Sequence, residues 1–175
     1  FAVVNRIDDF AYTPEQNIAH AMTALMAQNK GAGKTGRMKE GFRSGIILEI
    51  IYGILIFIIC FTFARPLMLM FVKDEEVIGH GVTYLHLISV MYLLPALTNG
   101  IQGFFRGIGD LKITLISSFI NMALRVLAAA PLVFIWKMGI EALPYSYLAG
   151  WIGMLVAETP LLLKTYKTWG KKARQ

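Results

Sequence analysis

The apolar run SGIILEIIYGILIFIICFTF at 44–63 limits what this chain can fold into more than any other feature. A helix needs about 20 mainly apolar residues to cross the hydrocarbon core of a bilayer. The composition agrees, because 56% of the residues are hydrophobic and only 16% are charged, whereas soluble domains carry about 25% charged residues. We therefore expect an all-α integral membrane protein.

Three further segments have the length and apolar character of membrane spans, namely 82–105, 113–136 and 144–163. The segment 1–29 is too polar by hydropathy alone, but at about 100° per residue its polar side chains gather on one face. A surface helix of a soluble domain would fit that pattern. The apolar neighbours favour a fifth spanning helix that turns its polar face to a water-filled cavity and is kinked at Pro14.

The basic residues predict how these spans are oriented. The segments 30–43, 106–112 and 164–175 carry twelve Lys and Arg residues, against three in the alternate loops. Lys and Arg in short loops stay on the cytoplasmic side. We expect a multi-pass plasma-membrane protein whose C-terminus, with a basic tail at 171–175, is cytoplasmic. The net charge of +6 is then mainly an orientation signal, and no nucleic-acid partner is expected.

The stretch GAGKT at 31–35 resembles part of a nucleotide-binding loop but does not meet its requirements. A phosphate-binding loop of the form GxxxxGK[ST] needs glycine at position 28, after a buried strand. Position 28 is Gln28, and a helical pattern precedes it. We therefore expect no ATP binding and no organic cofactor. Gly31 and Gly33 are expected to form a cytoplasmic turn between two helices, and FRGIGD at 105–110 is expected to form a second one.

These two turns and their surroundings resemble the multidrug and toxic compound extrusion (MATE) family. The similar stretches are NRIDDFAYTPEQNIAHAMTALMAQNKGAGK at 5–34 and QGFFRGIGDLKITLISSFINMALRVLAAAPL at 102–132. The resemblance covers about a third of the chain and assigns these residues to the two turns: Gln28, Asn29, Gly31, Gly33, Arg106, Gly107, Gly109 and Asp110.

The resemblance implies a helical bundle of two six-helix lobes, of which residues 1–170 would form part of the C-terminal lobe, with about five spans. The N-terminal lobe and one more helix would belong to a longer protein, which fits a chain that starts at Phe1. It also implies a secondary active antiporter that exports drugs or organic cations in exchange for Na⁺ or H⁺ by alternating access, and not an enzyme. A family member would have small-molecule substrates, the lipid bilayer and the missing lobe as its partners.

Ionisable and polar groups inside a membrane span are the candidates for the transport pathway, because burying a charge there costs about 2.5–3.5 kcal/mol. Polar contacts between helices are the alternative for each of them. Glu15 and Arg125 should lie at a similar depth, and we expect them to pair directly or through a polar network. The pathway candidates are Asp8, Tyr12, Glu15, Gln16, Asn99, Gln102, Asn121 and Arg125.

The other ionisable groups receive structural assignments. Glu49 and Glu158 are expected to reach the cytoplasmic interface or to pair with loop Lys and Arg. His20 and His86 do not form a metal-binding set. Several MATE proteins carry a coupling-ion carboxylate on the helix that matches 82–105, and this span has none. The resemblance therefore leaves the coupling ion open between Na⁺ and H⁺.

Two other functional classes have distinct requirements. A lipid-linked oligosaccharide flippase of the same broad superfamily would need a cavity rich in Arg and Lys for the pyrophosphate. A membrane-embedded enzyme would need a catalytic set, such as paired Asp on facing helices or a His–Glu metal motif, and the sequence has no such spacing. We expect no catalytic residues and no metal site.

Overall fold

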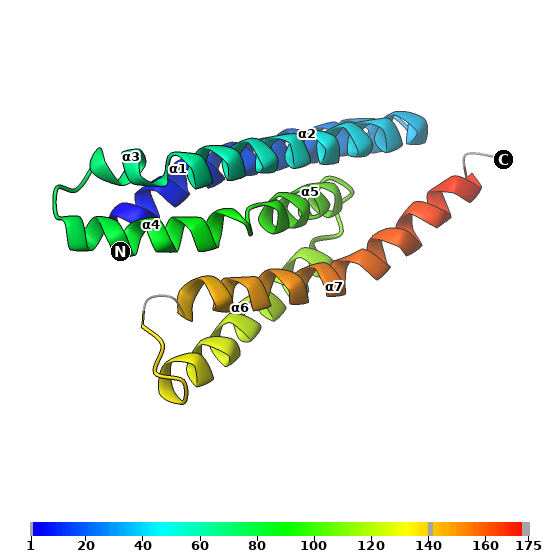
Figure 1. Ribbon diagram of the computed structural model, residues 1–175. Helices are drawn as coiled ribbons and strands as arrows, with labels where there is room; N and C mark the ends of the chain where they lie inside the picture. Colours follow the sequence, from blue (N-terminus) through cyan, green and yellow to red (C-terminus); the bar gives the residue numbers. More distant parts are fainter. Residues whose placement is uncertain (1, 140–141, 173–175) are drawn as a thin grey trace.

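The computed structural model describes residues 2–139 and 142–172, and all the elements in those residues are α-helices (Figure 1). The predicted all-α membrane fold is thereby confirmed. In chain order the helices are α1 (Ala2–Gly31), α2 (Thr35–Thr62), α3 (Ala64–Leu69), α4 (Glu75–Ser89), α5 (Leu93–Gly107), α6 (Leu111–Phe134) and α7 (Ala142–Lys172). Of the predicted basic tail, residues 171–172 belong to α7, and 173–175 lie outside the described residues.

Within residues 2–139 and 142–172, three helices are long and apolar enough to cross a membrane: Thr35–Thr62, Leu111–Phe134 and Ala142–Thr168. The pair α4 and α5 passes the same test as one span, although it bends by 49° at its break. Helix α1 covers the polar segment predicted as a span and continues through Pro14. Its crossing of the membrane stays a prediction, because it does not pass the test of composition.

The break in the fourth span has a local cause. Pro95 lies in the first turn of α5, where its missing N–H is tolerated, but it cannot continue a helix that arrives from α4. At the other end of α4, the Asp74 carboxylate accepts hydrogen bonds from the backbone N–H groups of Glu76 and Val77 at 2.9 and 3.2 Å. Asp74 is therefore the N-cap of α4, and Glu75 and Glu76 form its first turn, where negative charge is favourable.

The helices form two groups that meet at α5. Helices α1, α2, α4 and α5 pack together, and α6 and α7 form an antiparallel pair beside them (Figure 1). Helix α7 contacts α5 along its middle, whereas α6 has Ser117 as its buried residue. Phe119 and Leu127 of α6 are 72% and 67% exposed. Such a surface suits lipid or another part of a longer protein, because apolar residues on that scale are unfavourable in water.

Close contact between α1 and α5 depends on two glycines. A Cβ atom at Gly103 would lie 2.6 Å from the backbone oxygen of Ala19, and one at Gly107 would lie 2.6 Å from that of Thr23. Residues four apart lie on the same face of a helix. The sequence therefore presents Gly103 and Gly107 as one small-residue strip against α1, as membrane helix pairs often do. Gly107 was predicted only as a turn residue, and the structure adds this packing role.

The two predicted turns have the same backbone geometry. In the first, the N–H of Lys34 donates to the Asn29 carbonyl at 2.9 Å, and the N–H of Gly33 donates to the Lys30 carbonyl at 3.0 Å. In the second, Asp110 donates to Phe105 and Gly109 donates to Arg106 at 2.9 and 3.0 Å. This is the Schellman motif, which ends a helix on a residue with positive φ. Gly33 and Gly109 have φ of 68° and 79°.

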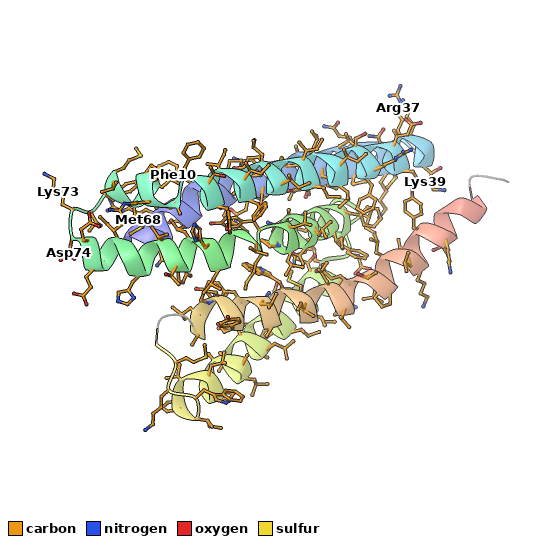
Figure 2. All side chains as sticks on the ribbon, viewed as in Figure 1. Phe10, Arg37, Lys39, Met68, Lys73 and Asp74 are labelled. Atoms are coloured by element: carbon orange, nitrogen blue, oxygen red, sulfur yellow. The ribbon has the colours of Figure 1, made fainter. Side chains whose placement is uncertain are left out.

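Both turns lie at the same end of the bundle. The Lys30 ammonium donates to the Ile108 carbonyl and so joins them directly. Figure 2 shows Arg37 and Lys39 at this end, whereas Lys73 and Asp74 lie at the opposite end. No described strand precedes the GAGKT turn, since α1 runs into it. A turn between two helices therefore accounts for the GAGKT stretch.

The first prediction compares two neighbouring glycines of the α1–α2 connection. Gly33→Ala should lower stability by about 1–2 kcal/mol, because a Cβ is unfavourable in the left-handed conformation. Gly36→Ala is the control, since Gly36 lies in α2 with ordinary φ and a Cβ there would have no neighbour within 4 Å. Thermal melting of the full-length protein in detergent would show a lower Tm for the first variant only. Equal Tm values for the two variants would contradict the left-handed conformation assigned to Gly33.

Candidate functional site

A cleft of about 570 Å³ lies between α1, α5, α6 and α7. Polar and aromatic side chains line it from all four helices, so it is a candidate binding site of the usual size for small molecules. Six of the predicted pathway residues reach it: Asp8, Tyr12, Asn99, Gln102, Asn121 and Arg125. Glu15 and Gln16 do not line it: Glu15 is buried behind it, and Gln16 is exposed on α1, where its side chain interacts with Tyr12.

The α1 wall of the cleft carries its negative charge. Asp8, Asp9 and Tyr12 all line the cleft, because residues three and four apart share a helical face. The Tyr92 hydroxyl, from the break between α4 and α5, donates to the Asp8 carboxylate. This bond holds a carboxylate at the cleft surface, where it is able to attract a cation.

The opposite wall carries the positive charge. Arg125 and Asn121 of α6 line the cleft, and the Arg125 guanidinium lies 3.8 Å from the centre of the Tyr147 ring of α7. Gly150 makes this contact possible, because a Cβ there would lie 2.6 Å from the Arg125 Cγ. A guanidinium over an aromatic face is a favourable cation–π arrangement. Arg125 is therefore held by α7 and not by α1.

The predicted direct pairing of Glu15 with Arg125 is wrong. Among the residues that the structure describes, the one ion pair joins Arg65 and Glu75, which are both exposed. Glu15 and Arg125 were placed together because they have similar depths along their helices. Depth does not determine which way two helices turn their side chains, and here α5 and the cleft separate the two groups.

The floor of the cleft is a buried amide–carboxylate contact. The Gln102 side-chain amide donates to the Glu158 carboxylate at 3.3 Å, and Ser117 and Arg106 lie nearby. Glu158 is 0% exposed. The prediction that it reaches the cytoplasmic interface is wrong, because α5 and α6 cover this face of α7. The predicted alternative, a pair with a loop Lys or Arg, is not formed as an ion pair among the described residues, although Arg106 interacts with Glu158.

Glu49 of α2 was also predicted to reach the cytoplasmic interface or to pair with a loop Lys or Arg, and this prediction is wrong as well. Glu49 is 0% exposed and forms no ion pair among the described residues. The signal was present in the sequence: Gly45, Glu49 and Gly53 are spaced by four residues and therefore share one face, and all three are buried. Two glycines flanking the acid indicate a face in close contact with another helix, which a charged side chain cannot leave easily.

Tyr147, Trp151 and Met154 of α7 line the cleft and were not among the predicted site residues. Their spacing at i, i+4 and i+7 is the signal that predicts a shared face. Two aromatic rings on this wall give the cleft a surface that suits flat or cationic organic molecules.

Known transport proteins match this chain over most of its length. The MatE family model matches residues 1–130. Two curated relatives are the probable multidrug resistance protein NorM of Thermotoga maritima, 25% identical over 95% of this chain, and the probable multidrug resistance protein YoeA of Bacillus subtilis, 28% identical over 98% of it. The chain spans only 36% and 37% of the length of these relatives.

Solved structures share the fold. One is the MATE transporter ClbM in complex with Rb⁺, with a TM-score of 0.86 and 16% identity over 95% of this chain and 38% of that one. Another is the inward-facing conformation of a multidrug resistance MATE family transporter of the MOP superfamily, with a TM-score of 0.81 and 15% identity over 89% of this chain and 35% of that one. With a family model that matches residues 1–130, the predicted resemblance is confirmed, and the chain belongs to the MatE family.

Proposed function

We propose that the complete protein is a secondary active exporter of small drugs or organic cations, driven by exchange for Na⁺ or H⁺. This chain supplies the greater part of one lobe, and the other lobe of the same protein completes the pathway. The observation that carries the proposal is the cleft, which is lined by the Asp8 carboxylate and by the aromatic side chains of Tyr92, Tyr147 and Trp151. A carboxylate near aromatic faces is able to hold an organic cation or release it to a competing ion.

The relatives support this class of substrate. NorM and YoeA are described as probable multidrug resistance proteins, and the ClbM structure contains Rb⁺. In transporters built from two repeats, substrate and ion sites lie between the halves, and rocking of one half against the other alternates access. The flippase alternative is not favoured, because Arg125 is the one basic side chain that lines the cleft among the described residues, against Asp8 and Asp9.

The proposed orientation follows from the two joined turns. The bond from Lys30 to Ile108 places both basic turns at one end of the bundle, and Figure 1 shows the C-terminal end of α7 pointing the same way. With Lys and Arg on the cytoplasmic side, the cleft wall that carries Asp8 lies toward the outer half of the plasma membrane.

An efflux experiment tests the proposed function. The protein from the complete reading frame is expressed in cells, which are loaded with ethidium, and the Na⁺ and H⁺ gradients are collapsed in turn. We expect collapse of one gradient to stop efflux, because secondary transport has no other energy source. Efflux that continues with both gradients collapsed and stops only when ATP is depleted would contradict the proposal.

A further inference from the structure

Two buried carboxylates lie behind the cleft, where α1, α2 and α5 meet. Glu15 of α1 and Glu49 of α2 are each 0% exposed. No oxygen of either carboxylate makes a hydrogen bond of ordinary geometry, although the Asn99 side chain interacts with Glu15. They are close enough to repel each other electrostatically when ionised. The pair separates two apolar clusters, one containing Ile7 and Cys60 and the other containing Met22 and Met38.

Among the described residues, no cation forms an ion pair with either carboxylate. Glu49 packs against α5 at Gly100, where a Cβ would lie 3.5 Å from the Glu49 Cγ. The titratable groups that face the pair are Tyr12 of α1 and Tyr52 of α2. The Tyr52 hydroxyl donates its hydrogen bond to the Ala11 carbonyl at 3.0 Å, and not to either carboxylate. Helix α5 faces the pair with Gly100 and Asn99.

Asn99 is the independent observation that points to a bound ligand. This side chain is 8% exposed, and its Oδ1 accepts a hydrogen bond from the Tyr12 hydroxyl at 3.2 Å. The Asn99 side chain also interacts with Glu15, although its Nδ2 makes no hydrogen bond of ordinary geometry. Asn99 and Tyr12 also line the cleft. A buried amide donor is thus directed at the acid pair from the wall that separates this pair from the cleft.

Energetics exclude two bare negative charges at this position. Removing an ion from water costs several kcal/mol in proteins even after relaxation, and an unpaired buried acid becomes neutral instead. Two adjacent carboxylates in one dry site do not both ionise. A proton is the cation that fits, because no three His, Cys, Asp or Glu side chains converge to hold a metal in the described ranges, and hard metal ions take about six oxygen ligands.

We propose that Glu15 and Glu49 form a proton-binding site behind the cleft, which holds at least one proton and exchanges it with cleft water when the Tyr12–Asn99 contact opens. The bound proton forms an O–H bond on one of the two carboxyl groups and neutralises it. On release it passes to a water molecule, and the Glu15 carboxylate left behind accepts a hydrogen bond from the Asn99 Nδ2. The exchange with the cleft rests on the proposed export function, whereas the protonation of the pair does not.

Infrared spectroscopy of the purified full-length protein tests the protonation. At neutral pH we expect the carbonyl stretch of a protonated carboxylic acid in the unmodified protein, and loss of part of that band in Glu15→Gln, Glu49→Gln and the double variant. Glu40→Gln is the matched control, because Glu40 is an acid of α2 outside the buried pair. Loss of ionised carboxylate bands from the Glu15 and Glu49 variants, with the acid band unchanged, would overturn the proposal. The single variants keep the test valid where the double variant does not fold.

Thermal melting distinguishes a proton from Na⁺ as the ligand. We expect the Tm of the unmodified protein to be the same in NaCl and in KCl of equal ionic strength. A Tm raised by Na⁺ alone, with this effect absent in Glu15→Gln and Glu49→Gln, would overturn the assignment to a proton.

The link to the cleft is tested by proton release. Ethidium is added to the protein in weakly buffered detergent solution with a pH-sensitive dye. We expect the unmodified protein to release protons when ethidium binds. The double variant Glu15→Gln/Glu49→Gln should still bind ethidium but release no protons. Unchanged release from this variant would overturn the link. A protein that neither binds nor exports ethidium would contradict the proposed function and leave the infrared result standing.

Discussion

Gly103→Ala in the full-length protein is expected to prevent most of it from reaching a stable folded state. The added Cβ would lie 2.6 Å from the backbone oxygen of Ala19 and 3.2 Å from its Cα. Because both contacts are with backbone, no side-chain rotation relieves them, and α1 and α5 have to separate. Overpacking of a well-packed interior costs about 1–3 kcal/mol and occasionally more, and the separation would also disturb the acid pair and the cleft.

Gly79→Ala is the matched control for this substitution. Gly79 is also inside a helix, α4, and a Cβ there meets nothing within 4 Å. Alanine is favoured over glycine in helices by about 1 kcal/mol, so this variant should be as stable as the unmodified protein or more stable. Size-exclusion chromatography with a fluorescent tag and thermal melting would measure both variants. A Gly103→Ala protein with unchanged yield and Tm would contradict the close contact between α1 and α5.

Asp8→Asn is expected to reduce efflux of a cationic drug about 10- to 100-fold, which corresponds to the 1.5–3 kcal/mol typical of a hydrogen bond or contact with a charged group. The substitution keeps the shape of the side chain and removes the charge that the α1 wall presents to the cleft. The Tyr92 hydroxyl is still able to donate to the amide oxygen, so we expect the fold to persist. Uptake of ethidium into inverted vesicles would measure the loss.

Two further variants show whether loss of the Asp8 charge causes the reduced efflux. Tyr92→Phe removes the donor to Asp8 and keeps the carboxylate, so it should have a smaller effect than Asp8→Asn. Glu76→Gln removes an exposed acid in the first turn of α4 and should transport normally. Transport by Asp8→Asn at the level of Glu76→Gln, with equal amounts of protein in the membrane, would rule out a role for the Asp8 charge in the proposed cycle.

Residues on one helix face could be predicted, because helical periodicity depends on sequence spacing alone. Asn121 and Arg125, four residues apart on the polar stripe of α6, were predicted as pathway residues, and both line the cleft. Asp8 and Tyr12 behave in the same way on α1. The partner that each stripe meets could not be predicted, since it depends on how the helices rotate and tilt against each other. For this reason Arg125 was matched to Glu15 when its contact is Tyr147.

By itself the sequence determined the membrane class, the two glycine turns and the family. Apolar length, helical period and the requirement for positive φ are local properties, and each can be read from neighbouring residues. Only the tertiary structure decided that Glu49 and Glu158 are buried, that Asp8 is held by Tyr92, and that Gly103 and Gly107 bring α1 against α5. Burial and partnership depend on the packing of several helices, because whether a carboxylate finds water or a neighbour is settled by residues far away in the chain.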